Sequence, residues 1–218
     1  SPQPEAGSPP SSMCPPSITE PPADLVLTRR GDTSQIGPLA QGVGRTTEEE
    51  YIMAIADALI GELEQEAGTT RRVLERVPGD KLTWKPHDKS MSLGRLALHV
   101  AQVPGFVGAL AVQNPAAFPE STQPNEASSA EQLLSAHDEG LAQAKQIVQG
   151  FDDAAMMESW SVTAGGKTLM TMPRIALLRA LMLNHWYHHR GQLSVYLRLL
   201  DVAVPSIYGP SADENPFG

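Results

Sequence analysis

Apolar residues recur at helical spacing over residues 47–77. Between residues 47 and 77 they return every three or four positions, and Pro78 ends the pattern. Thr47 and Glu50 match the S/T-x-x-E capping box that opens many helices. We therefore expect a first helix over residues 47–77. Its apolar face is formed by Ile52, Ile55, Leu59 and Leu63.

Two further helices are expected in the middle of the chain. The second begins at Ser92 and carries Pro104 within its apolar pattern, so a bend is expected there. A proline-rich loop at 114–125 separates it from the third helix, over 128–150. A second capping box, from Ser128 to Glu131, predicts where that third helix begins.

A short hairpin and a last helix complete the pattern. Residues 160–169 alternate like two strands joined by a glycine pair, which predicts a small hairpin. The last helix begins near Pro173, a residue favoured in a first helical turn, and runs to about Leu200. Four helices joined in this way predict an all-α fold, an antiparallel four-helix bundle with a small hairpin before the last helix. A tail with its own turn follows at 205–214.

The N-terminal segment differs from the rest of the chain. Residues 1–45 are rich in Pro, Ser and Gly and lack apolar periodicity, so we expect a flexible tail. The alternative is that Leu25–Leu27 docks as a strand on the domain. The expected organisation is thus a tail over 1–45 and one helical domain over 46–214.

Composition narrows the class of partner. The chain has 218 residues and a formal net charge of −9, and its longest basic cluster is Arg71-Arg72, which argues against a nucleic-acid partner. No uninterrupted apolar run approaches the roughly 20 residues that span a bilayer, and no signal peptide is recognised, so we expect no membrane association. The single cysteine, Cys14, cannot form an internal disulfide, which fits the cytoplasm.

The last helix carries the most informative polar residues. His185 and His189 are four residues apart, and therefore about 40° apart on one helix face. That face coincides with the apolar stripe, whereas His188 lies at its edge. Burying a polar group without a partner costs roughly 2–7 kcal/mol, and one metal ion would satisfy both rings. We therefore interpret His185 and His189 as candidate metal ligands.

A third candidate ligand lies on the second helix. His99 stands between Leu96 and Val103, which places it on the inward face. Three imidazoles with open coordination positions would suit Zn, Ni, Fe or Co. The alternative is that these are core histidines that only form hydrogen bonds. His137 is expected to be solvated on a polar part of the third helix.

Other catalytic signatures are absent from the sequence. Trp186 occupies the position of the glutamate in a His-Glu-x-x-His zinc peptidase, so that general base is missing. There is also no P-loop, no dinucleotide fingerprint and no G-x-S-x-G motif. No residue is therefore assigned a catalytic role, and the catalytic residues stay unknown.

Several stretches together resemble one known family. The chain is similar to the DinB family over 46–214, and the match combines residues of the second helix, the last helix and the C-terminal tail. The matching stretches are Trp84–Pro86, Ser90–Gly94, His99–Ala101, Asn184–Leu193, Tyr196–Arg198 and Pro205–Ser211.

The resemblance implies a four-helix bundle that holds one divalent ion, Zn, Ni or Fe, through His99, His185 and His189. It also implies a homodimer. Relatives with known activity depend on thiols, as do mycothiol-dependent maleylpyruvate isomerase and the bacillithiol transferases. We therefore expect a metal-dependent thiol S-transferase or a related hydrolase that acts on a small molecule, with a low-molecular-weight thiol as partner. The alternative is a non-catalytic metal-binding stress-response module.

Four further residues are weaker candidates for substrate binding or for supporting the ligands. Gln192 projects back toward the face of His185, so it is the better candidate to support a ligand. Arg190 serves the same purpose or faces solvent. Trp84 and Tyr208 are expected to line the mouth of the site or simply to pack.

Overall fold

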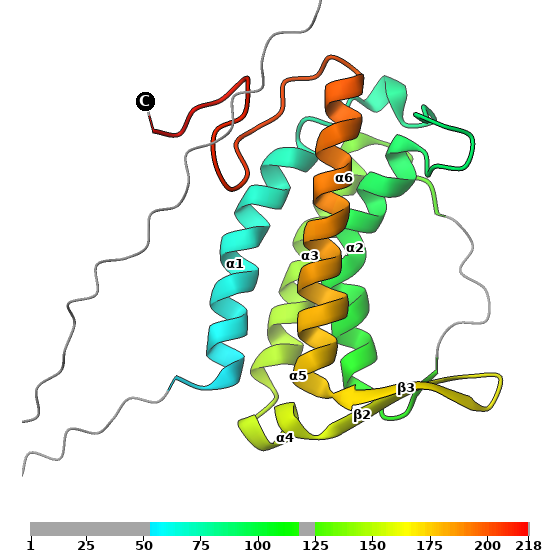
Figure 1. Cartoon of the computed structure of the whole chain (residues 1–218), viewed down its shortest axis with the longest axis vertical. Coiled ribbons are helices and arrows are strands. Elements are labelled where there is room, and N and C mark those ends of the chain that lie inside the picture. The colour runs from blue at the N-terminus through cyan, green and yellow to red at the C-terminus, as the bar shows by residue number, and fades with distance from the viewer. Residues whose placement is uncertain (1–52, 118–124, 218) are drawn as a thin grey trace, which may run out of the picture. The chain divides into compact units, whose positions relative to one another are not determined.

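The computed structural model describes residues 53–117 and 125–217. This part of the chain is mostly helical with a small three-stranded sheet, and its longest helices lie side by side (Figure 1). The helices are α1 (Ile55–Leu74), η1 (Gly79–Lys81), α2 (Leu93–Val112), α3 (Ala130–Gln149), α4 (Asp153–Met157), α5 (Arg174–Leu177), η2 (Leu178–Asn184) and α6 (His185–Leu199). The strands are β1 (Ala116–Ala117), β2 (Ser159–Ala164) and β3 (Lys167–Pro173).

The predicted tail over 1–45, its alternative docking strand Leu25–Leu27 and the capping box Thr47–Glu50 lie outside the described residues. The single cysteine, Cys14, lies outside them as well.

The beginning of α1 differs from the prediction. Met53 and Ala54 are not helical, and α1 begins at Ile55 rather than extending unbroken from residue 47. Ala54 has no side chain that can cap the helix. Instead, the amide of Ile55 donates a hydrogen bond of 2.9 Å to Asp153 Oδ1 at the start of α4. The cap is therefore a tertiary contact, which a local motif does not reveal.

The other two predicted helix starts are close to those observed. The Ser92 hydroxyl caps α2 as expected and accepts a hydrogen bond of 3.2 Å from the Arg95 amide. The cap of α3 is Ser129 rather than Ser128, and it accepts a hydrogen bond from the Gln132 amide. Both caps use the serine side chain to satisfy an amide that has no partner within the helix.

The predicted hairpin is confirmed, and the sheet contains one strand more than predicted. β2 and β3 pair antiparallel across Gly165 and Gly166, whose φ angles of 54° and 75° favour glycine. The short strand β1, in the region predicted to be a loop, pairs parallel to β2. The Asn114 side chain extends this pairing, because it bonds the Ser159 carbonyl and the Ser161 amide.

The last predicted helix is one rod in which a π-helix separates two α-helical segments. α5, η2 and α6 follow one another without a break, and Pro173 is the residue before the first turn. The segment Leu178–Asn184 is a π-helix, which a search for the α-helical period does not detect. The π-helix ends where His185 begins α6, so it sets the direction in which that side chain leaves the rod.

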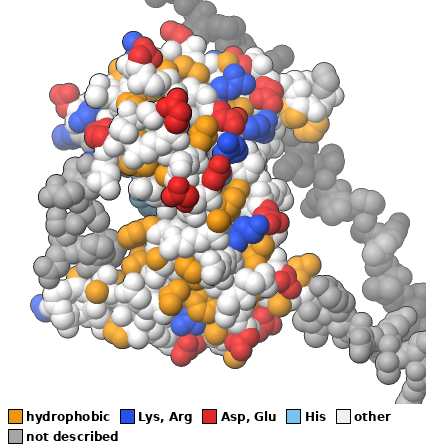
Figure 2. Space-filling model, turned by 180° about the vertical axis from the view of Figure 1, so that it is seen from behind, with side chains coloured by type: hydrophobic (Ala, Val, Ile, Leu, Met, Phe, Trp, Pro, Cys, Tyr) orange, Lys and Arg blue, Asp and Glu red, His pale blue; other side chains and the backbone are white. Residues whose placement is uncertain are grey.

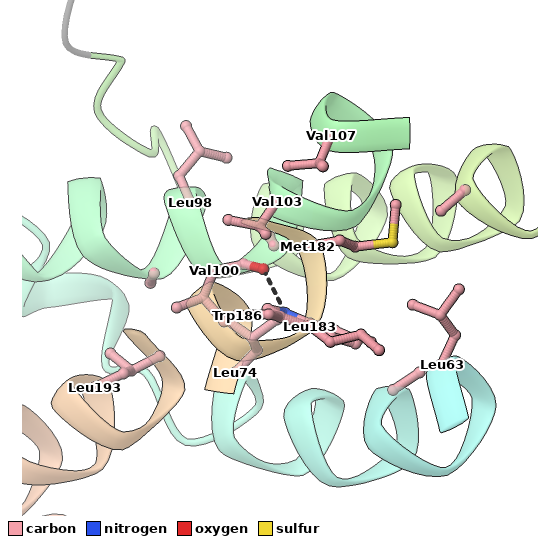
Figure 3. Close-up of a cluster of buried hydrophobic side chains, with 14 of the residues drawn as sticks. Leu63, Leu74, Leu98, Val100, Val103, Val107, Met182, Leu183, Trp186 and Leu193 are labelled. Atoms are coloured by element: carbon pink, nitrogen blue, oxygen red, sulfur yellow. Dashed lines mark hydrogen bonds between the residues drawn. The ribbon is translucent and has the colours of Figure 1, made fainter. Parts of the chain in front are cut away.

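A fully buried side chain of α6 forms a hydrogen bond to the middle of α2 (Figure 3). Pro104 lies inside α2 and has no amide hydrogen, so the carbonyl of Val100 four residues earlier loses its helical donor. The indole Nε1–H of Trp186 donates to that carbonyl at 2.8 Å, and Trp186 is fully buried. Pro104 is therefore accommodated because another helix supplies the missing donor.

The apolar character of α2 follows from its place in the core. An 18-residue window of this helix has a mean hydropathy of 1.4, so by length and composition it could cross a membrane, although the sequence shows no uninterrupted apolar run of that length. In the structure, 67% of the window is buried against the rest of the chain. Such burial is typical of a core helix, and α2 is weak support for a membrane span.

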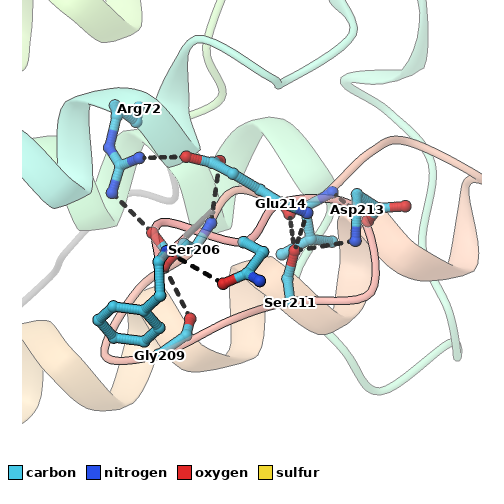
Figure 4. Close-up of polar contacts among 9 residues, drawn as sticks. Arg72, Ser206, Gly209, Ser211, Asp213 and Glu214 are labelled. Carbon is cyan, nitrogen blue, oxygen red and sulfur yellow. Dashed lines mark hydrogen bonds and ion pairs between the residues drawn. The ribbon is translucent and has the colours of Figure 1, made fainter.

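Polar contacts tie the C-terminal segment to α1 (Figure 4). Arg72 of α1 donates to the Ser206 carbonyl at 2.7 Å and to Glu214 at 2.8 Å. Within the segment, Ser211 accepts hydrogen bonds from the amides of Asp213 and Glu214. These contacts hold the C-terminal segment against the end of α1.

The Val100–Trp186 hydrogen bond can be tested with a double-mutant cycle. We expect Trp186→Phe to lower the free energy of unfolding by about 1–3 kcal/mol beyond its loss of packing, because a buried carbonyl is left without a donor. In a Pro104→Ala background the new amide supplies that donor, so the same substitution should cost less. Urea unfolding of the four proteins measures the coupling. Equal costs in both backgrounds would contradict this account.

Candidate metal centre

Three histidines from two helices meet on one side of the α2–α6 contact. His99 comes from the second turn of α2, and His185 and His189 come from successive turns at the start of α6. One ring nitrogen of each lies within 4.8 Å of those of the other two, an arrangement that could hold a metal ion. The sequence predicted these three residues, and the packing of α2 against α6 brings them together.

The orientation of the rings is that of converging ligands. His99 Nε2 and His185 Nε2 are 3.0 Å apart, and the three ring planes meet pairwise at 85–88°. Two nitrogens that are each ~2.1 Å from an ion lie about 3.0 Å apart at a right angle and about 3.4 Å apart at the tetrahedral angle. The donor set therefore fits one divalent ion with little movement.

Gln192 supports one of the three rings. Its Oε1 lies 2.7 Å from His189 Nδ1, one turn further along α6. An amide oxygen can only accept, so it holds the proton on Nδ1 and leaves the Nε2 lone pair of His189 for another partner. An oriented ligand of this kind is typical of metal-binding histidines.

Burial keeps the three rings neutral. Desolvation, followed by the neighbouring His189, His185 and Arg95, lowers the pKa of His99 from 6.5 to about 4. Desolvation is also the main cause of the lowered pKa values of His185 and His189. Neutral imidazoles are the form that binds metal ions, so the site is ready to bind near neutral pH.

The site is open to solvent on one side. His99 and His185 are half-buried, His189 is buried, and the supporting Gln192 is exposed. Figure 2 shows a histidine side chain partly visible on one face of the molecule. A partly open three-histidine set leaves room for a water molecule or a substrate beside the ligands.

Arg190 belongs to a different site from the three histidines. Its side chain is 1% exposed and pairs with Glu66 at 2.6 Å, so the expectation that it faces solvent is wrong. It also donates to Thr70 and to the hydroxyl of Tyr208, which in turn donates to Glu66. Arg190 and Tyr208 therefore fasten α6 and the C-terminal segment to α1, and no bond joins either of them to the three histidines.

The remaining aromatic and histidine candidates have other contacts. Trp84 packs edge-on against Tyr196 with ring centroids 5.7 Å apart, and the Tyr196 hydroxyl donates to the Met91 carbonyl. Trp84 therefore lies beside the N-terminus of α2, where its carbonyl also accepts a hydrogen bond from the Leu93 amide. His188 is exposed, with its ring 5.0 Å from His189.

His137 is buried, which corrects the expectation that it is solvated. It is 2% exposed and its ring is 6.2 Å from that of Trp186, between α3 and α6. Its Nδ1 bonds the adjacent Asp138, which also pairs with Arg71 of α1. Its Nε2 is buried and has no partner within the described residues. The sequence analysis missed this inward position because the residues next to His137 are polar.

Comparisons with known proteins agree on the family. The model of the DinB family matches residues 53–215. The chain is 28% identical over 163 residues to YrdA, an uncharacterized protein of Bacillus subtilis strain 168. This alignment covers 72% of the present chain and 90% of YrdA.

Two solved structures have a similar fold. A DinB-like protein from Bacillus cereus ATCC 10987 is 22% identical with a TM-score of 0.57, over 71% of this chain and 98% of that one. A DinB-like protein from Bacillus subtilis, YjoA, is 18% identical with a TM-score of 0.52, over 66% and 92% of the two chains. The family model spans nearly all of the described residues, and the chain therefore belongs to the DinB family.

Proposed function

We propose that this protein binds one divalent metal ion, Zn, Ni or Fe, through His99, His185 and His189, and that it is a metal-dependent thiol S-transferase or a related hydrolase. The observation that carries the proposal is the convergence of three perpendicular imidazoles from two helices, two of whose nitrogens are 3.0 Å apart.

A dipositive ion with open positions lowers the pKa of a bound thiol or water and so supplies a nucleophile at neutral pH. The chain's own residues prepare for this chemistry. Burial keeps His99 neutral, and Gln192 fixes the proton of His189 on Nδ1. The half-buried position of His185 leaves one side of the set accessible to a small molecule.

We also propose that α1, α2, α3 and the rod α5–η2–α6 form the antiparallel four-helix bundle expected from the sequence, and that two copies form a homodimer. Figure 1 supports the first part, because these four segments lie side by side. The dimer rests on the family resemblance alone, and light scattering of the purified protein measures it directly.

Two other interpretations of the histidines compete with this proposal. A non-catalytic metal-binding stress-response module would bind the ion and turn nothing over. A structural cluster would use only the hydrogen bond between His99 and His185. Among the residues that the structure describes, the Nε2 of His189 has no hydrogen-bond partner, which favours the metal.

Metal content distinguishes the structural cluster from the other two. We expect protein purified without a polyhistidine tag to contain about one Zn, Ni or Fe ion per chain by elemental mass spectrometry. His185→Ala should lose the ion, because it removes one of three ligands. His188→Ala is the matched control on the same helix and should retain it. Protein that stays metal-free after reconstitution with all three ions would overturn the proposal.

Turnover then distinguishes the enzyme from the non-catalytic module. Loaded protein would be offered low-molecular-weight thiols with a panel of electrophiles, and hydrolysable esters and amides without thiol. Turnover that disappears on chelation and in His185→Ala supports the enzyme. Stoichiometric metal without turnover over the whole panel would favour the non-catalytic module.

The contact between Gln192 and His189 should affect metal affinity. Gln192→Leu keeps the size of the side chain but removes the acceptor that orients the ring, so we expect metal binding to weaken roughly 10- to 100-fold. Gln146→Leu makes the same change at an exposed position of α3 and should leave affinity unchanged. Competition with a chromophoric chelator measures both, and equal affinities would contradict the supporting role.

The lowered pKa values predict how pH affects the metal-free protein. An unfolded histidine takes up its proton near pH 6.5, whereas His99 does so only near pH 4 in the folded state. The unfolded state therefore binds more protons, and the free energy of unfolding should fall as the pH decreases from about 6.5 to about 4. In His99→Gln this fall should be smaller, and in His87→Gln, an exposed histidine that is not among the groups acting on the three rings, it should match the wild type. Urea unfolding at successive pH values tests this, and identical slopes in His99→Gln and wild type would refute it.

A further inference from the structure

One cation lies beside the three histidines without a role in the fold. Arg95 precedes His99 by one turn of α2, so the two side chains start about 5–6 Å apart on the same face. Arg95 is also among the charged groups that lower the pKa of His99, which is consistent with this spacing. Arg95 is exposed at that position.

The guanidinium of Arg95 makes no ion pair or hydrogen bond with any residue that the structure describes, and only its backbone amide is bonded, to the capping Ser92. A carboxylate at this helix end, that of Glu126, accepts the hydroxyl of Ser92 instead. Most other described arginines are ion-paired, among them Arg71, Arg72, Arg174, Arg179, Arg190 and Arg198.

The position of Arg95 is also unfavourable for the helix. It lies in the first turn of α2, where the partial positive charge of the helix N-terminus repels a cation and would favour an acidic residue. The first turn of α2 has no acidic residue. Within the part of the chain that the structure describes, no ion pair, hydrogen bond or helix-end charge therefore accounts for this arginine.

The charged neighbours of the three histidines are basic side chains. The groups that act by charge on the three rings are the rings themselves, His188 and Arg95, and no described carboxylate is among them. This contrasts with a chain whose formal net charge is −9. Because the rings are neutral near pH 7, Arg95 is the one permanent charge among these groups, and it makes this side of an acidic protein locally positive.

We propose that Arg95 binds an anionic group of the substrate or thiol, a carboxylate or an oxyanion of similar shape, while another atom of the same molecule approaches the metal. The inference rests on the proposed metal centre and adds the charge class of its ligand. Arg95 is the specificity-determining residue, since a guanidinium presents two parallel donors to a carboxylate. A molecule without that anionic group lacks this contact.

The test uses protein loaded with Co²⁺, whose absorption spectrum reports a thiolate entering the coordination sphere. The probes are 3-mercaptopropionate and its uncharged amide, which differ only in the charged group. The quantity measured is the ratio of the two dissociation constants, in wild type, Arg95→Gln and Arg95→Lys. Lys167→Gln is the matched control, because it removes one exposed positive charge in the hairpin.

In the wild type we expect the anionic thiol to bind more tightly than the amide, and Arg95→Gln to reduce this preference about fivefold, the scale of a partly exposed ion pair. Binding of the amide should not change, Arg95→Lys should retain part of the preference, and Lys167→Gln should retain all of it. High salt should weaken the preference in the wild type.

An unchanged ratio in Arg95→Gln would overturn the proposal while leaving the metal centre intact. Failure of the wild type to bind Co²⁺ at all would overturn the metal centre and this inference with it. Because Arg95 is exposed and bonds no described side chain, its substitutions are not expected to unfold the chain, and circular dichroism with metal stoichiometry verifies this for each variant.

Discussion

The orphaned carbonyl of Val100 is the constraint on which the candidate site depends. Pro104 removes its helical donor, and Trp186 supplies a donor from α6 at 2.8 Å. A buried carbonyl without a partner is costly, so α2 and α6 are held in one register. His99 lies one residue before Val100, and His185 one residue before Trp186. The hydrogen bond that satisfies the core therefore also brings the two imidazoles together.

A buried ion pair also holds α6 on the side that faces α1. Arg190 is buried against Glu66 of α1, and Tyr208 of the C-terminal segment bonds both. If the two helices moved apart, a buried charge would lose its partner, and the free-energy cost of that loss opposes the movement. The early turns of α6 are thus held between α2 and α1, so His185 and His189 project from a rigid segment and not from a loop.

Rigid placement and desolvation together give the histidines their character. The rings are held with their planes nearly perpendicular, and burial lowers their pKa values, so they remain unprotonated near neutral pH. The preceding π-helix also contributes to the placement of the rings, since it ends where His185 begins α6. Wider turns of this kind often lie beside functional residues, because they redirect side chains without ending the helix.

The sequence by itself determined the approximate positions of α2, α3 and the last helical rod, the glycine turn of the hairpin and the shared face of His185 and His189, because periodicity and turn chemistry are local properties. Tertiary structure decided the features that depend on distant partners. These include the start of α1 at a cap from Asp153, the pairing of β1, and the burial of Arg190 and His137. A periodic pattern shows which residues share a face, but only packing decides what that face meets.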